Sequence, residues 1–206
     1  MKEAEQTYRR ELMVELLLTD RGITDDHVLT AFEVVPRHRF VDPEDQQSAY
    51  DDEALPLGDS GEAISDPYAT AWLLESAVIS RGQRVLEIGT GSGYFAALAS
   101  FLGAEVHTIE RHPALAQRAE KLLAALAPGV TVHQGDGWMG LPEHAPFDRI
   151  VVGCATENVS PAWLAQLSPD GLIVVPLGKD QQLSTVSASG ERKSLGHSGF
   201  APLARG

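Results

Sequence analysis

A glycine loop that directly follows an apolar strand pattern is the feature of this sequence best suited to chemistry. The segment Val85–Ile88 is apolar except for Glu87, and it runs into the loop GTGSG at residues 89–93. Glycines at a strand-to-helix junction let the backbone turn sharply and approach a ligand closely. The GxGxG spacing differs from the GxGxxG of dinucleotide sites, in which a helix N-terminus faces a pyrophosphate. The loop therefore favours a ligand without phosphates, such as S-adenosyl-L-methionine.

Three acidic residues accompany successive strand patterns. Glu87 precedes the loop, where a carboxylate can orient the loop and, directly or through water, the ammonium group of the methyl donor. Glu110 ends the second pattern and can accept hydrogen bonds from both ribose hydroxyls. Asp136 follows the third and is suited to the adenine amine, although Glu110 and Asp136 could instead cap the helices that follow. The expected cofactor is S-adenosyl-L-methionine, with S-adenosyl-L-homocysteine as product. The residues expected to hold it are Glu87, Ile88, Gly89, Thr90, Gly91, Ser92, Glu110, Arg111, Asp136 and Gly137.

Alternating strand and helix patterns are expected to position these residues. From residue 84 onward the chain alternates in a way typical of βαβ units, which form a parallel sheet with right-handed crossovers. Two tail segments, Gln182–Ser187 and Phe200–Leu203, predict an antiparallel addition at the sheet edge. The expected strands are Arg84–Ile88, Glu105–Glu110, Val130–Gln134, Asp148–Val152 and Leu172–Pro176, and the expected helices are Tyr94–Leu102, His112–Leu126 and Pro161–Leu167.

The first 80 residues differ from the rest in pattern. We expect helices at Tyr8–Leu18, His27–Val34 and about Tyr68–Val78. Between the last two lies Asp42–Asp66, an irregular stretch with at most a short hairpin, and ordered loops of this length are often functional. The expected organisation is therefore one compact domain: helices and a substrate-facing loop at residues 1–80, packed on an α/β cofactor-binding core at residues 81–206.

Composition narrows the classes of partner. The 206 residues carry 29 acidic and 16 basic side chains, a formal net charge of −13, which disfavours binding to nucleic acid. The single cysteine excludes an intrachain disulfide, and no apolar run has the length of a membrane span. The histidines and the cysteine show no metal-ligand spacing, so no metal site is expected. These features predict a cytoplasmic protein without a membrane partner, whose oligomeric state is open, with a monomer favoured.

The order of several motifs resembles the protein-L-isoaspartate O-methyltransferase family. VLTAFEVVPRHRFV at Val28–Val41, AYDDEALPLG at Ala49–Gly58 and AISDPYATAWLLE at Ala63–Glu75 are similar to segments specific to that family. VLEIGTGSGY, GDGW and FDRIVVGCAT follow in the same order. The resemblance covers nearly all of residues 27–178. It implies a seven-stranded class I, Rossmann-like methyltransferase fold with a mostly parallel sheet, helices on both faces and an N-terminal helical extension.

The resemblance also implies an activity and a set of substrate contacts. The activity is methyl transfer to the carboxylate of an isoaspartyl residue in a damaged protein or peptide, the first step of protein repair. Ser65 is the expected catalytic residue, touching both donor and acceptor, unless it only caps the following helix. The backbone near Val175 is expected to pair with an extended peptide by strand addition. The expected substrate residues are Tyr50, Asp51, Leu55, Pro56, Asp66, Tyr68 and Val175, with Pro36, Arg37 and His38 nearby.

Asp66 departs from the family pattern, which has Ala or Gln at this position. A carboxylate beside the acceptor pocket would repel an anionic isoaspartyl group. The departure leaves two alternatives open: an enzyme that methylates a specific Asp or C-terminal carboxylate of a biosynthetic peptide, or a non-catalytic donor-binding module with its pocket filled by Asp66 and Tyr68. A nucleic-acid amino-methyltransferase is disfavoured, because Gly153–Asn158 lacks the Pro-Pro-aromatic segment that stacks a flipped base.

Overall fold

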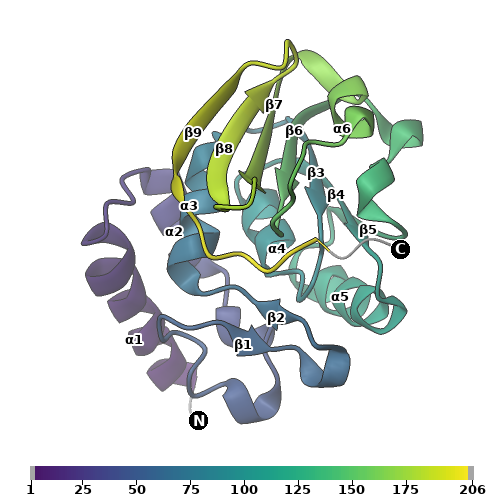
Figure 1. Ribbon diagram of the computed structural model, residues 1–206. Helices are drawn as coiled ribbons and strands as arrows, with labels where there is room; N and C mark the ends of the chain where they lie inside the picture. The colour runs from purple at the N-terminus through teal and green to yellow at the C-terminus, as the bar shows by residue number, and fades with distance from the viewer. Residues whose placement is uncertain (1–2, 204–206) are drawn as a thin grey trace.

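A seven-stranded sheet forms the centre of the computed structural model, which describes residues 3–203 (Figure 1). The strand order is β5-β4-β3-β6-β7-β8-β9. Within this sheet, β3 to β7 run parallel, and β8 and β9 are antiparallel to their neighbours. The bounds are β3 Arg84–Ile88, β4 Glu105–Glu110, β5 Val130–Gln134, β6 Phe147–Val152, β7 Leu167–Leu177, β8 Gln182–Ser187 and β9 Arg192–His197.

The strand order reverses at β3. The chain moves outward through β4 to the edge strand β5, then returns to place β6 on the other side of β3. In open parallel sheets, ligands bind outside the carboxyl ends of the strands at such a switch point. The glycine loop at residues 89–93 directly follows β3, so the topology places it where a ligand is expected.

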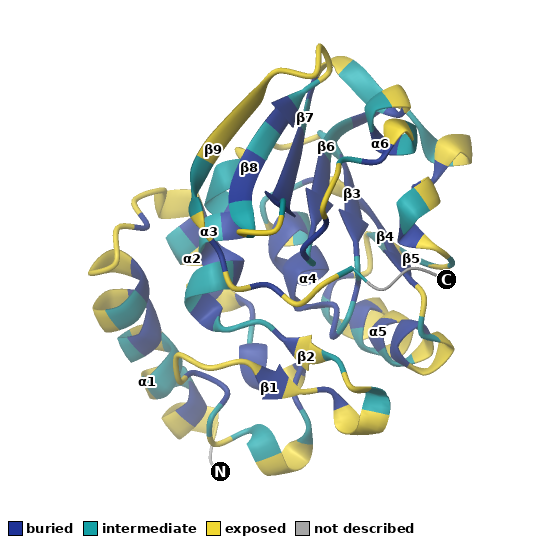
Figure 2. Cartoon of the chain, viewed as in Figure 1, coloured by how far each residue is buried: buried dark blue, intermediate teal, exposed yellow. Residues whose placement is uncertain are grey.

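The central strands of the sheet are mostly buried (Figure 2). Alternation along the strands gives the sheet two apolar faces. Val85, Val106 and Val151 point to one face, which packs against α2 Asp26–Val34, α3 Pro67–Ala77, α4 Tyr94–Phe101 and α5 Pro113–Leu126. Leu86 and Ile150 point to the other face, beneath α6 Pro161–Ala165 and the short 3-10 turns Gly137–Met139 and Pro142–His144. The β3, β4 and β5 bounds match the predicted ones; β3 and β4 are largely buried, whereas β5 lies at the sheet edge without a buried residue.

The N-terminal segment is helical, as predicted, but not uniform. α1 spans Glu3–Leu12 and continues as a π-helix, Met13–Thr19, rather than as one regular α-helix. The buried residues of the π-helix are Met13, Val14 and Leu18, whereas Leu16 is 59% exposed. Residues of these helices share one apolar core with the sheet and α3 to α5. No helix within residues 3–203 is long and apolar enough to cross a membrane.

Two short segments lie over the carboxyl ends of the parallel strands. β1 Leu55–Pro56 and β2 Ala63–Ile64 form the short hairpin predicted within residues 42–66, which also hold the 3-10 turns Pro43–Asp45 and Gly58–Ser60. The tail differs from the prediction. The added strands are β8 and β9, whereas residues 198–203 leave the sheet and cross in front of α4 (Figure 1). There Ala155 forms an isolated parallel bridge with Pro202, so Phe200–Leu203 is not an antiparallel edge strand.

Candidate active site

Two adjoining pockets form one cleft at the carboxyl ends of β3, β4 and β6. They hold about 490 and 700 Å³ of space, which includes the open solvent at their mouths. The first is lined by Glu87, Thr90 and Ser92, together with Thr70 and Phe95. The second is lined by residues that end β3 and β4 and by the turn after β5. Both pockets share Ala63, Ser65, Gly89, Gly91 and Gly153.

Glu87 is the buried carboxyl of the first pocket. It is only 3% exposed, and the Thr108 hydroxyl donates to its Oε2 at 2.6 Å. The Thr90 hydroxyl lies 2.6 Å from that of Thr108, so a chain of hydrogen bonds links Glu87 to the glycine loop. Desolvation raises the pKa of Glu87 to about 8; the Thr108 bond opposes this shift and the negative charge of Glu110 adds to it. Glu87 is thus linked to the loop through two threonine hydroxyls, and its contact with the ammonium group of the donor stays a prediction.

Glu110 fastens the loop from the other side. Its two carboxylate oxygens accept from the backbone N–H groups of Gly91 and His112, each at 2.9 Å. The side chain also lines the second pocket, and each oxygen keeps a free lone-pair direction for a ligand hydroxyl. Capping and ligand binding are thus compatible functions of one carboxylate.

The glycines permit a loop that other residues would strain. Gly89, Gly91 and Gly93 have φ values of +90°, +51° and +85°, a region that side chains rarely adopt. A Cβ on Gly137 would lie 2.6 Å from Cγ2 of Ile88. The glycine there lets the turn after β5 pack directly on the end of β3, so that Ile88 and Gly137 form one continuous wall.

The other residues predicted to bind the methyl donor lie in the wall of the cleft or at its edge. Arg111 lines the second pocket beside Glu110. Asp136 is exposed and accepts from the Trp138 backbone N–H at 3.0 Å, which is the helix-capping alternative. Its neighbour Gly137, rather than the Asp136 side chain, faces the cleft. A contact between Asp136 and adenine stays a prediction.

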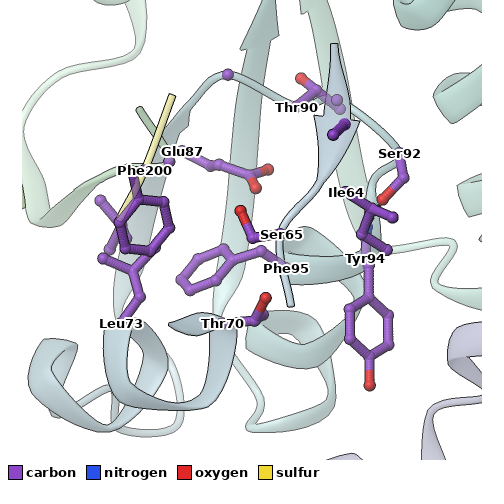
Figure 3. A pocket seen from close by; sticks show the side chains of 15 residues that line it. Ile64, Ser65, Thr70, Leu73, Glu87, Thr90, Ser92, Tyr94, Phe95 and Phe200 are labelled. Carbon is purple, nitrogen blue, oxygen red and sulfur yellow. Dashed lines mark hydrogen bonds between the residues drawn. The ribbon is translucent and has the colours of Figure 1, made fainter. Parts of the chain in front are cut away.

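Ser65 lies where the two pockets meet. Figure 3 shows its hydroxyl and the Glu87 carboxyl directed into the same space, with Phe95 and Thr70 beneath them. The alternative in which Ser65 caps α3 is wrong, because the N-cap is Asp66, whose carboxylate accepts from Ala69 N–H at 2.7 Å. The Asp66 carboxylate therefore interacts with the N-terminal end of α3. Its side chain is not among the described residues that line the cleft.

The hairpin above the cleft is fixed by polar contacts. Asp42 accepts from the Gly58 backbone N–H at 2.8 Å and pairs with Arg118 of α5 at 2.5 Å. Glu62 lies 3.2 Å from the His112 ring nitrogen. These contacts hold residues 62–65 against the start of α5, and they carry Ser65 into the cleft without a covalent or metal link.

The predicted peptide contacts lie elsewhere. Among the described residues, none of the seven lines the cleft. Tyr50 and Asp51 line a separate groove along α1, where the Tyr50 hydroxyl bonds His38 Nδ1 at 2.8 Å. Leu55 is buried, Pro56 is exposed on the hairpin, and Tyr68 stacks on Trp72 beneath the Arg21 guanidinium. Arg37 and His38, expected near the substrate residues, are both buried.

The prediction for Val175 is wrong. Strand addition needs a free sheet edge. Val175 lies inside β7, which pairs with β8 on one side, with Val175 opposite Ser184, and with β6 on the other. The side chain is fully buried. The apolar run at the end of β7 marks an interior strand and not a peptide-binding edge.

Several cleft residues were not predicted. Thr108 lies in an apolar strand, and its role depends on cross-strand contact with Glu87. Phe200 closes the first pocket, and residues 201–203 wall the second, across from Cys154, whose pKa burial raises to about 12. The motif GFAPL at residues 199–203 was the one signal for this wall.

The groups that line the cleft suit S-adenosyl-L-methionine. A buried carboxyl at one end matches an ammonium group, a second carboxylate matches vicinal hydroxyls, and positive-φ glycines between them leave room for close approach. A pyrophosphate would favour a cluster of Lys or Arg side chains at the loop. Among the described residues that line the cleft, Arg111 is the only Lys or Arg. Sheet order, loop and carboxylates together define a class I S-adenosyl-L-methionine-dependent methyltransferase.

Comparison with known proteins gives the family. The chain belongs to the protein-L-isoaspartate(D-aspartate) O-methyltransferase family, whose sequence profile matches residues 8–204. A protein-L-isoaspartate O-methyltransferase of Gloeobacter violaceus is 46% identical over 179 residues, covering 85% of this chain and 87% of that protein. The enzyme of that name from Methylorubrum extorquens is 43% identical over 203 residues, covering 96% and 89%.

Solved structures agree with this fold. A protein-L-isoaspartate O-methyltransferase structure superposes with a TM-score of 0.82 at 27% identity, over 95% of this chain and 66% of that one. A putative enzyme of the same kind from Plasmodium falciparum, in complex with S-adenosyl-L-homocysteine, gives a TM-score of 0.83 at 21% identity, over 95% and 98%. At that identity the second likeness shows the fold alone.

Proposed function

We propose that this chain methylates the carboxylate of isoaspartyl residues in proteins or peptides, with Ser65 at the reacting centre. The observation that carries the proposal is the position of Ser65, which lines both pockets and faces the same space as Glu87 (Figure 3). The relatives at 43–46% identity that carry the isoaspartate methyltransferase name support the choice of acceptor.

The chemistry of the first pocket favours an acceptor that is already an anion. S-adenosyl-L-methionine, when bound, supplies an electrophilic methyl group on a sulfonium centre. A carboxylate acceptor is ionised at neutral pH and needs no general base. Among the described residues that line this pocket there is no histidine or lysine. The residues of the chain therefore act by binding, by orienting the acceptor and by excluding water.

The structure weakens the reasons for the two alternatives. A non-catalytic module needs Asp66 and Tyr68 to fill the acceptor pocket, but neither lines the described cleft. Charge repulsion by Asp66 was the reason to favour a dedicated biosynthetic peptide. The Asp66 carboxylate instead accepts a hydrogen bond at the start of α3, so its charge is compatible with an isoaspartyl acceptor.

Paired peptides that differ only in Asp or isoAsp at one position test the proposal. We expect base-labile methyl incorporation with isoAsp and little with Asp. Equal incorporation into both peptides would point to a carboxyl methyltransferase of different specificity. Donor binding without transfer to either peptide would overturn the proposal.

Ser65→Ala is expected to lower kcat/KM for the isoAsp peptide by about 10- to 100-fold, since one hydrogen bond to a charged carboxylate contributes about 1.5–3 kcal/mol. Donor affinity, measured by calorimetry, is expected to change less. Ser80→Ala, an exposed serine outside the cleft, is the matched control. An unchanged kcat/KM would show that Ser65 lines the cleft without contributing to methyl transfer.

Asp66→Ala is expected to lower the free energy of unfolding by about 1 kcal/mol through loss of the N-cap, whereas Asp66→Asn keeps the cap and changes it less. Urea denaturation measures this difference. Both variants are expected to keep the isoAsp activity of the native chain per folded molecule. A rise in activity in both would show that Asp66 repels the acceptor after all.

A further inference from the structure

Three histidines from separate elements meet on the α6 face of the sheet. His107 lies on β4, His133 on the edge strand β5, and His144 ends the 3-10 turn Pro142–His144. One ring nitrogen of each lies within 4.8 Å of the other two. None of the three lines the cleft, and the proposed reaction uses none of them.

The three rings lie close together, and those of His107 and His133 are stacked, with centroids 5.3 Å apart and an interplanar angle of 24°. His107 Nδ1 lies 3.1 Å from His133 Nε2. The His144 ring centroid lies 4.5 Å from that of His107 and 4.7 Å from that of His133. Nitrogens bound to one tetrahedral zinc ion at 2.0–2.1 Å lie about 3.4 Å apart. Small side-chain rotations would therefore bring the three nitrogens to that spacing.

Glu105 supplies a partner for the outer nitrogen of His107. Its Oε1 lies 3.3 Å from His107 Nε2, so that Nε2 donates to the carboxylate. This bond leaves Nδ1 unprotonated and directed toward His133. A carboxylate that holds the far nitrogen of a metal-binding histidine is the usual support of such sites.

We propose that His107, His133 and His144 bind a divalent transition-metal ion, with zinc as the expected occupant, and that Glu105 is a positioning residue for His107. Three imidazoles with one open position match a four-coordinate zinc site completed by water. His107 is 7% exposed, whereas His133 and His144 are half-buried and leave a path for the ion.

An ion at this position would connect three elements. It would tie β4 to the edge strand β5 and to the end of the segment that leaves β5 at residue 135. That segment carries Gly137, whose backbone forms part of the cleft wall. The site would hold this wall segment at both ends, at His133 and at His144.

Zinc titration of the full chain, freed of metal by a chelator, tests the proposal. We expect one zinc ion per chain by calorimetry, with a rise in Tm. His133→Gln and His144→Gln should each weaken binding by at least about 100-fold, and Glu105→Gln by about 10-fold, as supporting residues of metal sites do. His27→Gln removes an exposed histidine outside the cluster and should bind zinc like the native chain.

Cobalt(II) gives a second readout, because tetrahedral coordination produces intense visible absorption bands. We expect these bands in the native chain and in His27→Gln, and their loss in His144→Gln. Circular dichroism of each variant checks that its fold is kept. Native-like zinc affinity in both His133→Gln and His144→Gln, or no zinc binding by the folded native chain, would overturn the proposal.

Discussion

Glu87→Gln is expected to stabilise the free protein at and above neutral pH. Burial raises the pKa of Glu87 to about 8, far above the unfolded value of about 4.3. The folded state therefore binds the extra proton, so this contribution is fully present below about pH 4 and is lost as pH rises to 8. Glutamine stays neutral and keeps an oxygen to accept from Thr108. We expect a gain on the order of 2 kcal/mol at pH 8.

Urea denaturation at pH 5 and pH 8 measures this gain, which should grow with pH. Glu120→Gln, on the exposed side of α5, is the control and should show no such growth. The same Glu87→Gln change should weaken donor binding by about 10- to 100-fold, because a charge-assisted bond to an ammonium group is lost. Native donor affinity in the variant would mean that Glu87 serves only the loop.

Donor binding should also release a proton in the native chain. An ammonium group beside Glu87 favours the ionised carboxylate. The pKa of Glu87, about 8 in the free protein, should therefore be lower in the donor complex. Between pH 6 and 7.5 the affinity should rise with pH. Calorimetry in buffers of different ionisation enthalpy reports the released proton, and the release should be absent in Glu87→Gln.

Glu110→Gln is expected to have the opposite effect on stability. Both oxygens of Glu110 accept from backbone N–H groups, of Gly91 and His112. Glutamine has one oxygen, and its NH₂ group would face the other N–H. Loss of one charge-assisted bond and exposure of an unpaired donor should lower the free energy of unfolding by about 2 kcal/mol.

Donor affinity should fall by about 100-fold or more in Glu110→Gln, because two hydroxyl bonds to a charged acceptor weaken together. Calorimetry with donor and urea denaturation check the two effects, again against Glu120→Gln. Removal of the negative charge should also lower the pKa of Glu87, which Glu110 raises. An increase in stability in Glu110→Gln would contradict the hydrogen-bond assignment.

The parts of the fold that could be predicted are those with strong local patterns. The bounds of β3, β4 and β5 were predicted correctly from short strand patterns between helical ones. β3 and β4 are largely buried, whereas β5 is an edge strand without a buried residue. β9 was missed because it is an edge strand with mostly polar, exposed residues and a glycine, Gly196. The π-helix after α1 was missed because no residue pattern distinguishes it from a regular helix.

The residues of the candidate site also differ in how far the sequence could locate them. Glu87, the glycine loop and Glu110 belong to one strand-loop unit and its neighbour, so spacing located them. Asp136 follows the end of β5, as predicted. Spacing cannot tell whether its carboxylate caps the next turn or faces the cleft, because that depends on the direction of the side chain. Thr108, Phe200 and the histidine cluster depend on contacts between distant segments, which spacing along the chain does not contain.

The wall formed by residues 200–203 is made late in synthesis. The ribosome makes the glycine loop, Glu87 and Glu110 about a hundred residues before it makes this wall. A nascent chain that has already formed β3 to β7 would lack Phe200 and the bridge at Ala155, so its cleft would be open on that side. We therefore expect methyl transfer that depends on water exclusion to begin only after this late segment docks.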